Sequence, residues 1–335
     1  MLDLNSPTQL IDQFNRKITY VRLSVTDRCD FRCVYCMSEK MTFLPRAQLL
    51  TLEELEWLGR AFLELGVTKI RLTGGEPLVR HNILQLFQGL GRLSGLKELV
   101  LTTNGSQLIK MAQPLKAAGV KRINISLDSL NPARFQNMTR VGKLEGVLRG
   151  IDAAIQVGFE RVKLNAVILK NRNHDEVIDL VQFAVNRGID ISFIEEMPLG
   201  TIGSHDRAEA FYASEQIRDD LKSSFTLIPS TEKTAGPSKY YRVAHTDTRV
   251  GFISPHSHNF CDTCNRVRVT TEGRLLLCLG QEHSVDLRRV IRANPGDIEP
   301  LKQAIIKAIA IKPQKHDFEL DSAPQILRYM NMTGG

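Results

Sequence analysis

The sequence predicts an α/β fold: a partial barrel of six parallel βα units, then a C-terminal region of antiparallel strands and helices. One pattern supports the barrel most strongly. A glycine followed at once by a strand-like run recurs four times, at Gly66, Gly119, Gly158 and Gly188. Glycine here is typical of the left-handed residue that ends a helix, and the β-branched run after it is typical of a strand. Helices that alternate with strands at this period favour a parallel sheet.

The expected elements follow in order along the chain. Helical periodicity precedes the glycines, as in residues 52–65 and 177–187, with Thr51 and Asn173 as candidate N-caps. The expected barrel strands cover residues 18–25, 67–73, 98–103, 120–127, 159–168 and 189–195.

After about Pro198 the pattern changes. Short alternating runs, including 249–253 and 266–270, indicate antiparallel strands that lay a second cluster, on Cys261, Cys264 and Cys278, across the barrel mouth. A helical stretch follows over 285–311. We therefore expect a barrel over residues 1–198 and a C-terminal region over residues 199–335. In a barrel of this kind, the loops after the strands carry the chemistry.

Composition narrows the classes of function. No run of about 18 apolar residues exists, so we expect no membrane span. The N-terminal residues have the character of neither a secretory signal nor a transit peptide, which favours a cytoplasmic protein. The formal net charge of +7 suits an acidic ligand but does not distinguish a nucleotide from a nucleic acid.

A set of three cysteines, Cys29-x3-Cys33-x2-Cys36, follows the apolar stretch 21–25. A 4Fe-4S cluster normally takes four cysteines, so three thiolates leave one iron open to a small molecule. The alternatives are a zinc site or three unrelated buried cysteines. Zinc prefers four protein ligands, and no fourth cysteine or histidine is near in sequence, so the set predicts a catalytic cluster.

A second set of three, Cys261-x2-Cys264 with Cys278, again lacks a fourth cysteine. Odd sets and the absence of a secretory signal argue against disulfides. The set predicts a second 4Fe-4S cluster. A zinc site remains an alternative here, completed by one of three nearby histidines: His256, His258 and His283.

Three cations stand within or beside apolar strands: Arg22, Arg71 and Lys163. A buried cation without a partner is costly, and each residue taken singly is expected to face outward by strand alternation. Three strands that each contribute one cation at comparable depth instead favour a polyanionic ligand such as a triphosphate.

The first cysteine set, with Tyr35 inside it and the lead-in from Thr26 to Arg28, resembles the signature of the radical S-adenosylmethionine superfamily. The resemblance implies a partial barrel, binding of S-adenosylmethionine to the open iron, and its reductive cleavage to a 5'-deoxyadenosyl radical. Glu76, after the two glycines at Gly74 and Gly75, offers a carboxylate for the methionyl amine. The cofactor contacts implied by the superfamily are Tyr35, Gly75, Glu76, Ser126 and Met197.

The second cysteine set, the segment Asn265-Arg266-Val267-Arg268 and the final Gly334-Gly335 resemble the GTP 3',8-cyclase family of molybdenum cofactor biosynthesis. That resemblance implies removal of the ribose 3' hydrogen of GTP and attack of the C3' radical on guanine C8. The second cluster would hold the guanine, and the glycine tail would reach into the site. Asp30 stands where many relatives carry Asn. The implied GTP-binding residues are Arg22, Arg71, Thr102, Lys163, Arg266, Val267 and Arg268, with Arg266 and Arg268 also in a catalytic role.

The same resemblance implies a homodimer, an external electron donor, and transfer of the product to a cyclic pyranopterin monophosphate synthase, with no nucleic-acid partner. Two other functions compete. A different radical enzyme acting on a peptide or RNA would use Arg266 and Arg268 to bind backbone or phosphodiester. A zinc or iron-sulfur nucleic-acid-binding module would need basic and aromatic residues interleaved, yet aromatics make up only 6% and form no such stripe.

Overall fold

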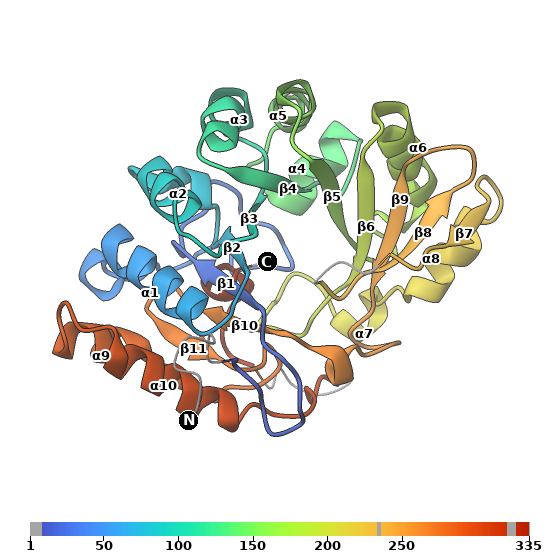
Figure 1. Ribbon diagram of the computed structural model, residues 1–335. Helices are drawn as coiled ribbons and strands as arrows, with labels where there is room; N and C mark the ends of the chain where they lie inside the picture. Colours follow the sequence, from blue (N-terminus) through green and yellow to red (C-terminus); the bar gives the residue numbers. More distant parts are fainter. Residues whose placement is uncertain (1–8, 233–235, 320–325, 335) are drawn as a thin grey trace.

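The computed structural model describes residues 9–232, 236–319 and 326–334. In these residues the predicted barrel is confirmed: six parallel strands alternate with helices, which lie on the outside of the curved sheet (Figure 1). The strands are β1 (Tyr20–Ser24), β2 (Lys69–Thr73), β3 (Glu98–Thr103), β4 (Val120–Ser126), β5 (Arg161–Ile168) and β6 (Asp190–Glu195). Between them lie α1 (Leu52–Glu64), α2 (Ile83–Gly91), α3 (Leu108–Ala117), α4 (Pro132–Thr139), α5 (Leu144–Val157) and α6 (Val177–Arg187), and the short 3-10 turns η1 (Arg46–Gln48), η2 (Pro77–Val79) and η3 (His174–Glu176).

The four glycines that predicted the repeat all have a positive φ, from 63° to 90°. Each therefore takes the left-handed conformation that turns the chain from a helix into the next strand. This confirms the sequence interpretation on which the parallel sheet depends.

The two predicted helix caps behave differently. Thr51 forms a capping box with Glu54: its Oγ1 accepts from the Glu54 N–H at 3.1 Å, and the Glu54 carboxylate accepts from the Thr51 N–H at 2.8 Å. Asn173 stands at the N-cap position of η3, not of α6, and its side chain makes no capping hydrogen bond there. Its Nδ2 donates instead to the carbonyls of Asp128 and Val167, and α6 starts later, after Glu176.

The C-terminal region adds six strands: β7 (Leu227–Pro229), β8 (Lys239–Val243), β9 (Arg249–Ile253), β10 (Arg266–Val269), β11 (Arg274–Leu276) and β12 (Ser284–Asp286). As predicted, β7, β8 and β9 pair antiparallel, and so do β10, β11 and β12. However, β9 also pairs in parallel with β6, and β10 in parallel with β1. The expected position of the second cluster across the barrel mouth stays a prediction, whereas the parallel pairing of these strands with the barrel was not predicted. They extend both edges of the barrel and satisfy backbone groups that an edge strand would leave unpaired.

The resulting sheet runs in the order β12-β11-β10-β1-β2-β3-β4-β5-β6-β9-β8-β7 in the described residues. The predicted helical stretch over 285–311 is two helices, α9 (Leu287–Ala293) and α10 (Glu299–Ala310), and they lie near α1 (Figure 1). Further short elements are α7 (Arg207–Ala210), α8 (Ser214–Leu221), η4 (Cys261–Thr263) and α11 (Met330–Thr333). No described helix combines the length and hydropathy that crossing a membrane requires.

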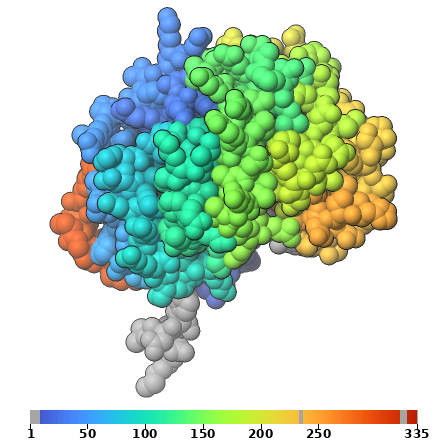
Figure 2. All heavy atoms as spheres, turned by 90° about the horizontal axis from the view of Figure 1, so that it is seen from above, coloured from blue at the N-terminus to red at the C-terminus, as the bar shows by residue number. Residues whose placement is uncertain are grey.

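Each barrel strand separates an apolar face from a polar one. On β1, Val21 and Leu23 are fully buried in the hydrophobic core, whereas Tyr20 and Arg22 line a cavity inside the barrel. The helical layer from α2 to α6 covers the apolar face and forms a continuous surface of cyan to yellow-green segments (Figure 2). Because side chains alternate along a strand, the polar positions all turn to the inside. The fold therefore assembles a polar site at the centre of the barrel.

Candidate active site

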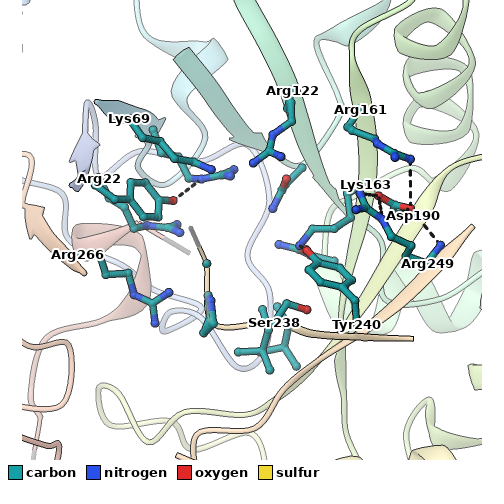
Figure 3. A pocket seen from close by; sticks show the side chains of 18 of the residues that line it. Arg22, Lys69, Arg122, Arg161, Lys163, Asp190, Ser238, Tyr240, Arg249 and Arg266 are labelled. Atoms are coloured by element: carbon teal, nitrogen blue, oxygen red, sulfur yellow. Dashed lines mark hydrogen bonds and ion pairs between the residues drawn. The ribbon is translucent and has the colours of Figure 1, made fainter. Parts of the chain in front are cut away.

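The cavity inside the barrel has a strongly basic wall (Figure 3). Strand register sets the basic residues side by side: Arg22 pairs in register with Arg71 on β2 and with Arg268 on β10. Like charges held this close repel one another unless an anion lies between them, so the wall favours an anionic ligand. Its basic residues are Arg22, Lys69, Arg71, Arg122, Arg161, Lys163, Arg249, Arg266 and Arg268.

The three cations predicted from the barrel strands, Arg22, Arg71 and Lys163, all line this cavity. Strand alternation turns them inward, so the alternative of outward-facing side chains is wrong. Arg71 Nε donates to Tyr20 Oη at 2.6 Å, and Lys163 Nζ donates to Ser192 Oγ at 3.1 Å. These hydrogen bonds fix the positions of the two cations, which prepares them for a ligand.

Thr102 contacts Arg71 directly. Its Oγ1 accepts a hydrogen bond from Arg71 Nη1 at 2.9 Å, and the carbonyl of Leu101 accepts another at 3.0 Å. This contact gives Thr102 a role in orienting Arg71. Its direct contact with GTP stays a prediction.

Part of the cavity wall was missed in the sequence. Tyr20 and Lys69 stand two positions before Arg22 and Arg71, so strict two-residue alternation could have found them. Their neighbours on further strands, Arg122, Arg161 and Arg249, are also absent from the predicted set.

These additional cations have carboxylate partners. Glu98 Oε2 lies 2.7 Å from Lys69 Nζ and 3.0 Å from Arg122 Nη2. Asp190 Oδ2 lies 2.6 Å from Arg249 Nη2. Much of the charge of these additional cations is therefore balanced within the protein.

Arg266 and Arg268 stand two residues apart on β10, and both line the cavity. Arg268 is buried, which lowers its pKa well below the usual value, and it donates to the carbonyl of Gly334. Arg22 Nη2 lies 3.5 Å from the same carbonyl. The predicted approach of the tail to the site therefore holds for Gly334, while Gly335 lies outside the described residues. Val267 turns its side chain into the core, with 1% exposed.

A second cavity adjoins the first and contains the second cysteine set. Met197, Arg266 and Arg268 line both cavities, so one ligand could extend from the basic wall to the cysteines. The remaining wall is mostly apolar, which restricts water around the thiols. It consists of Pro255, Phe260, Val267, Leu276, Leu277, Leu279, Gly280, His316 and Phe318.

The charges around this second set are positive. Burial raises the pKa values of Cys261 and Cys278. Burial also acts on Cys264, but the charges of Arg266 and Lys312 outweigh it and lower the Cys264 pKa. Positive surroundings favour the thiolate form, which is the form that binds metal.

Arg16 hydrogen-bonds to the backbone of two chain segments at the second cavity. Its Nη1 donates to the carbonyls of Cys261 at 2.8 Å and Gln314 at 2.7 Å, and its Nη2 donates to the carbonyl of Pro313 at 2.6 Å. Its Nε pairs with Asp12 at 2.6 Å, and both side chains are almost fully buried. One N-terminal residue thus ties together two C-terminal segments.

The histidines considered for zinc lie elsewhere in the described part of the chain. His256, His258 and His283 are not in the cavity wall, and His256 Nε2 lies 2.9 Å from the carbonyl oxygen of Glu196. His316, which was not predicted, lines the cavity instead. Across the described ranges, no three His, Cys, Asp or Glu side chains are arranged to hold a single metal ion. A cubane cluster makes no such demand, since each thiolate binds a different iron.

The first cysteine set lies on the loop after β1 as three free, partly buried thiols. The Phe31 N–H donates to Cys29 Sγ at 3.3 Å, and Asn104 Nδ2 lies 3.7 Å from the same sulfur. Hydrogen bonds to sulfur are among the factors that tune iron-sulfur clusters, so the donor set fits such a group. Burial raises the pKa of all three thiols, most clearly for Cys33.

Carboxylates are the charges that act most strongly on the thiols of this first set. After burial, the carboxylate of Glu76 is the main cause that raises the pKa of Cys29, and Asp128 has the same effect on Cys33. Asp30 also lies close: its carboxylate accepts from Asn104 Nδ2 and from Ser106 Oγ, both at 2.6 Å. Asp30 therefore links the cysteine loop to the loop after β3.

The loop after β2 packs tightly on the chain that leads into the cysteines. A Cβ on Gly75 would lie 2.3 Å from the Arg28 carbonyl oxygen, and one on Gly74 would lie 2.4 Å from that of Thr26. Only glycine fits at these two positions.

Glu76 is fully buried, and burial raises its pKa to about 7. Its carboxylate accepts from Leu78 N–H, Asn104 N–H and Thr103 Oγ1. A carboxylate has about four acceptor positions, so one remains for a further donor. The predicted contact of Glu76 with an ammonium group is compatible with this arrangement and stays a prediction.

The other predicted cofactor contacts come from different strands and loops of the barrel. Tyr35 Oη donates to Asp128 Oδ2 at 2.7 Å, which ties the cysteine loop to the end of β4, where Ser126 lies. Burial raises the pKa of Asp128 to about 6. Met197 lies after β6, where the two cavities meet. The barrel thus gathers these side chains at the carboxyl ends of its strands.

Comparison with known proteins decides the family. Two family profiles match the chain: the Radical SAM superfamily over residues 23–184 and Molybdenum Cofactor Synthesis C over residues 189–318. A GTP 3',8-cyclase from Saccharophagus degradans is 61% identical over 326 residues, which cover 97% of this chain and 98% of that protein. The chain belongs to the GTP 3',8-cyclase family. The cyclase of Pseudomonas entomophila is also 61% identical, over 98% of this chain and 99% of its own length.

Solved structures agree with the cyclase fold described above. SuiB from Streptococcus suis, bound to S-adenosylmethionine, superposes with a TM-score of 0.63 over 96% of this chain and 79% of that chain. At 15% sequence identity, this similarity concerns the fold alone. As a radical SAM protein, this member of the cyclase family uses S-adenosylmethionine and an iron-sulfur cluster.

Proposed function

We propose that the chain converts GTP to (8S)-3',8-cyclo-7,8-dihydroguanosine 5'-triphosphate, the first step of molybdenum cofactor biosynthesis, with S-adenosylmethionine as co-substrate. One observation carries this proposal most directly: Arg266 and Arg268 line both the basic cavity and the cysteine cavity. GTP has the matching chemistry, a polyanionic tail at one end and a purine at the other. The relatives from Saccharophagus degradans and Pseudomonas entomophila are GTP 3',8-cyclases, which is consistent with this substrate.

We further propose two 4Fe-4S clusters, one on Cys29, Cys33 and Cys36 and one on Cys261, Cys264 and Cys278. When bound, the first cluster would supply the electron for cleavage of S-adenosylmethionine, the chemistry needed for removal of hydrogen from C3' of GTP. The support is the donor chemistry: two sets of three free thiols in separate surroundings.

The residues of the basic cavity would hold the triphosphate. Arg22, Arg71 and Lys163 supply charged donors from three different strands, so a chain of phosphates can be contacted at several points. Arg266 and Arg268 would orient the nucleotide where the two cavities meet, and Val267 holds their strand in the core. Thr102 would act by fixing Arg71.

The residues near the first cysteine set would hold S-adenosylmethionine. Family resemblance assigns this role to Tyr35, Gly75, Glu76, Ser126 and Met197. Gly75 packs against the Arg28 backbone with no room for a Cβ, and this packing fixes the loop that carries Glu76 against the chain leading into the cysteines.

We also propose a homodimer in the reducing cytoplasm, an external electron donor, and a cyclic pyranopterin monophosphate synthase as the protein that receives the product. These proposals rest on the family assignment.

The activity is tested by anaerobic incubation with S-adenosylmethionine, a reductant and GTP deuterated at C3'. Deuterium should appear in 5'-deoxyadenosine, and a cyclised triphosphate should form with GTP but not with ATP, CTP or UTP. Deuterium-free 5'-deoxyadenosine, or equal turnover of all four nucleotides, would contradict the proposal.

Metal analysis tests the two clusters. Anaerobic reconstitution should give about eight irons per chain. A result of about four irons with one zinc would instead support a zinc site on the second cysteine set.

A further inference from the structure

Tyr20 stands among the cations of the basic cavity. It lies on β1, its side chain is almost fully buried, and its Oη is 2.6 Å from Arg71 Nε. Its register partners are Lys69 on β2 and Arg266 on β10. Lys69 Nζ lies 5.2 Å from the centre of the Tyr20 ring. The phenol is therefore surrounded by positive charge from both neighbouring strands.

The charged groups around Tyr20 come from every strand packed against it. Its own strand provides Arg22, β2 provides Lys69 and Arg71, and β10 provides Arg266 and Arg268. One strand further on, Glu98 is held by Lys69 and Arg122. Among the described residues of the cavity wall, Asp190 is the acidic one, and it pairs with Arg249 and Arg161.

We propose that Tyr20 is a phenolate in the free protein, where it accepts a hydrogen bond from Arg71, and that it takes up a proton when the triphosphate binds. This inference rests on the proposed placement of the GTP triphosphate in the basic cavity. In the free protein the phenolic O–H bond breaks and its proton goes to solvent. When the triphosphate neutralises the charges of Arg71 and Arg22, the phenolate oxygen takes up a proton from solvent. No electrons are transferred.

The electrostatics agree with this geometry. Burial by itself raises the pKa of Tyr20, but the charges of Arg71, Arg22, Lys69 and Arg266 outweigh it and lower the pKa to about 6. An anionic ligand among the same cations would neutralise their effect and return the pKa toward its ordinary value. Near neutral pH, nucleotide binding would then be linked to uptake of about one proton.

The test is GTP binding to the anaerobic holoenzyme between about pH 7 and about pH 8.5, where the terminal phosphate is already ionised. The Kd of the parent should rise about tenfold per pH unit because binding takes up one proton. In Tyr20→Phe, the Kd should stay nearly constant over this range. The matched control is Tyr240→Phe, on the opposite wall, where Oη accepts from Lys163 Nζ at 3.2 Å; this variant should keep the parent's pH dependence.

Calorimetry of the parent gives a second measurement that needs no variant. The binding enthalpy in buffers of different ionisation enthalpy should reveal uptake of about one proton per GTP at about pH 8, and none in Tyr20→Phe. A parent that binds GTP with no proton uptake and a constant Kd would overturn the proposal, and so would equal uptake in parent and Tyr20→Phe. A parent that cleaves S-adenosylmethionine but does not bind GTP would contradict the proposed function instead.

Discussion

The two cysteine sets have the same number of thiols but opposite electrostatic surroundings. In the first set, Glu76 and Asp128 are the charges that act most on the thiols, although Arg32 donates to the carbonyl of Cys29. Cations surround the second, with Arg266 and Lys312 as the main charges. Negative charge near a cluster stabilises its oxidised form and lowers its reduction potential, whereas positive charge has the opposite effect. The first site is therefore suited to giving an electron to a sulfonium, and the second to holding an anionic substrate.

The largest expected effect tests how the second region is anchored. Arg16→Ala removes one partner of a buried ion pair with Asp12 and three hydrogen bonds to the second cysteine region. Breaking such a pair costs about 3–5 kcal/mol, so the free energy of unfolding should fall by about that amount. Iron content should drop from about eight to about four as the second site loses its cluster.

Arg161→Ala is the matched control for this experiment. Its side chain is 44% exposed and lies 3.9 Å from Asp190, so its loss should cost less than about 1 kcal/mol and leave the iron content unchanged. Equal stability and iron content in Arg16→Ala and the parent would mean that Arg16 does not hold the second site.

Nucleotide binding tests the cations shared by the two cavities. Arg266→Ala or Arg268→Ala should each weaken GTP binding about tenfold to a hundredfold, since each loses a charged hydrogen bond of about 1.5–3 kcal/mol. Binding of S-adenosylmethionine should change little, and GTP titration of the anaerobic variants measures the difference. Unchanged GTP affinity in the double variant would remove these arginines from the binding site, and binding of RNA or a peptide would favour a different radical enzyme.

The smallest effect is on cluster potentials, and it tests the electrostatic comparison itself. Asp30→Asn removes a negative charge beside Asn104 and Ser106, so the potential of the first cluster should rise. Arg266→Gln removes a positive charge near Cys264, so the potential of the second should fall. Each potential should shift by on the order of 60 mV, which corresponds to a tenfold change in the equilibrium constant of a one-electron couple. Redox titration followed by EPR measures both; equal potentials in the parent, or shifts of opposite sign, would contradict the comparison.

The barrel could be predicted from the sequence because its signals are local. The glycines at Gly66, Gly119, Gly158 and Gly188 each mark a helix end and a strand start within a few residues. The pairing of β10 with β1 could not be predicted, because it joins segments far apart in the chain and depends on which edges the barrel leaves open. The same limit hid Arg16, whose carbonyl partners are at Cys261 and beyond.

The sequence identified candidate site residues that belong to a motif. It missed residues whose place in the cavity only the three-dimensional structure reveals. The six cysteines and Arg266 and Arg268 stand in recognisable spacings. Tyr20 belongs to no such motif. Two-residue alternation with Arg22 could have placed it in the cavity wall, but its role depends on cations from two neighbouring strands. Asn173 failed as a cap because its side chain amide joins Asp128 and Val167, a tertiary contact that local propensity does not contain.

The division of labour between the two cysteine sets is tested most directly by cleavage of S-adenosylmethionine without GTP. The measurement is 5'-deoxyadenosine formed under reducing, anaerobic conditions by two matched variants, Cys33→Ser and Cys264→Ser. Cys33→Ser should form none, because the electron source for the sulfonium is lost. Cys264→Ser should cleave the cofactor at a rate near that of the parent but fail to cyclise GTP. Equal loss of cleavage in both variants would contradict the separation of cofactor chemistry from substrate binding.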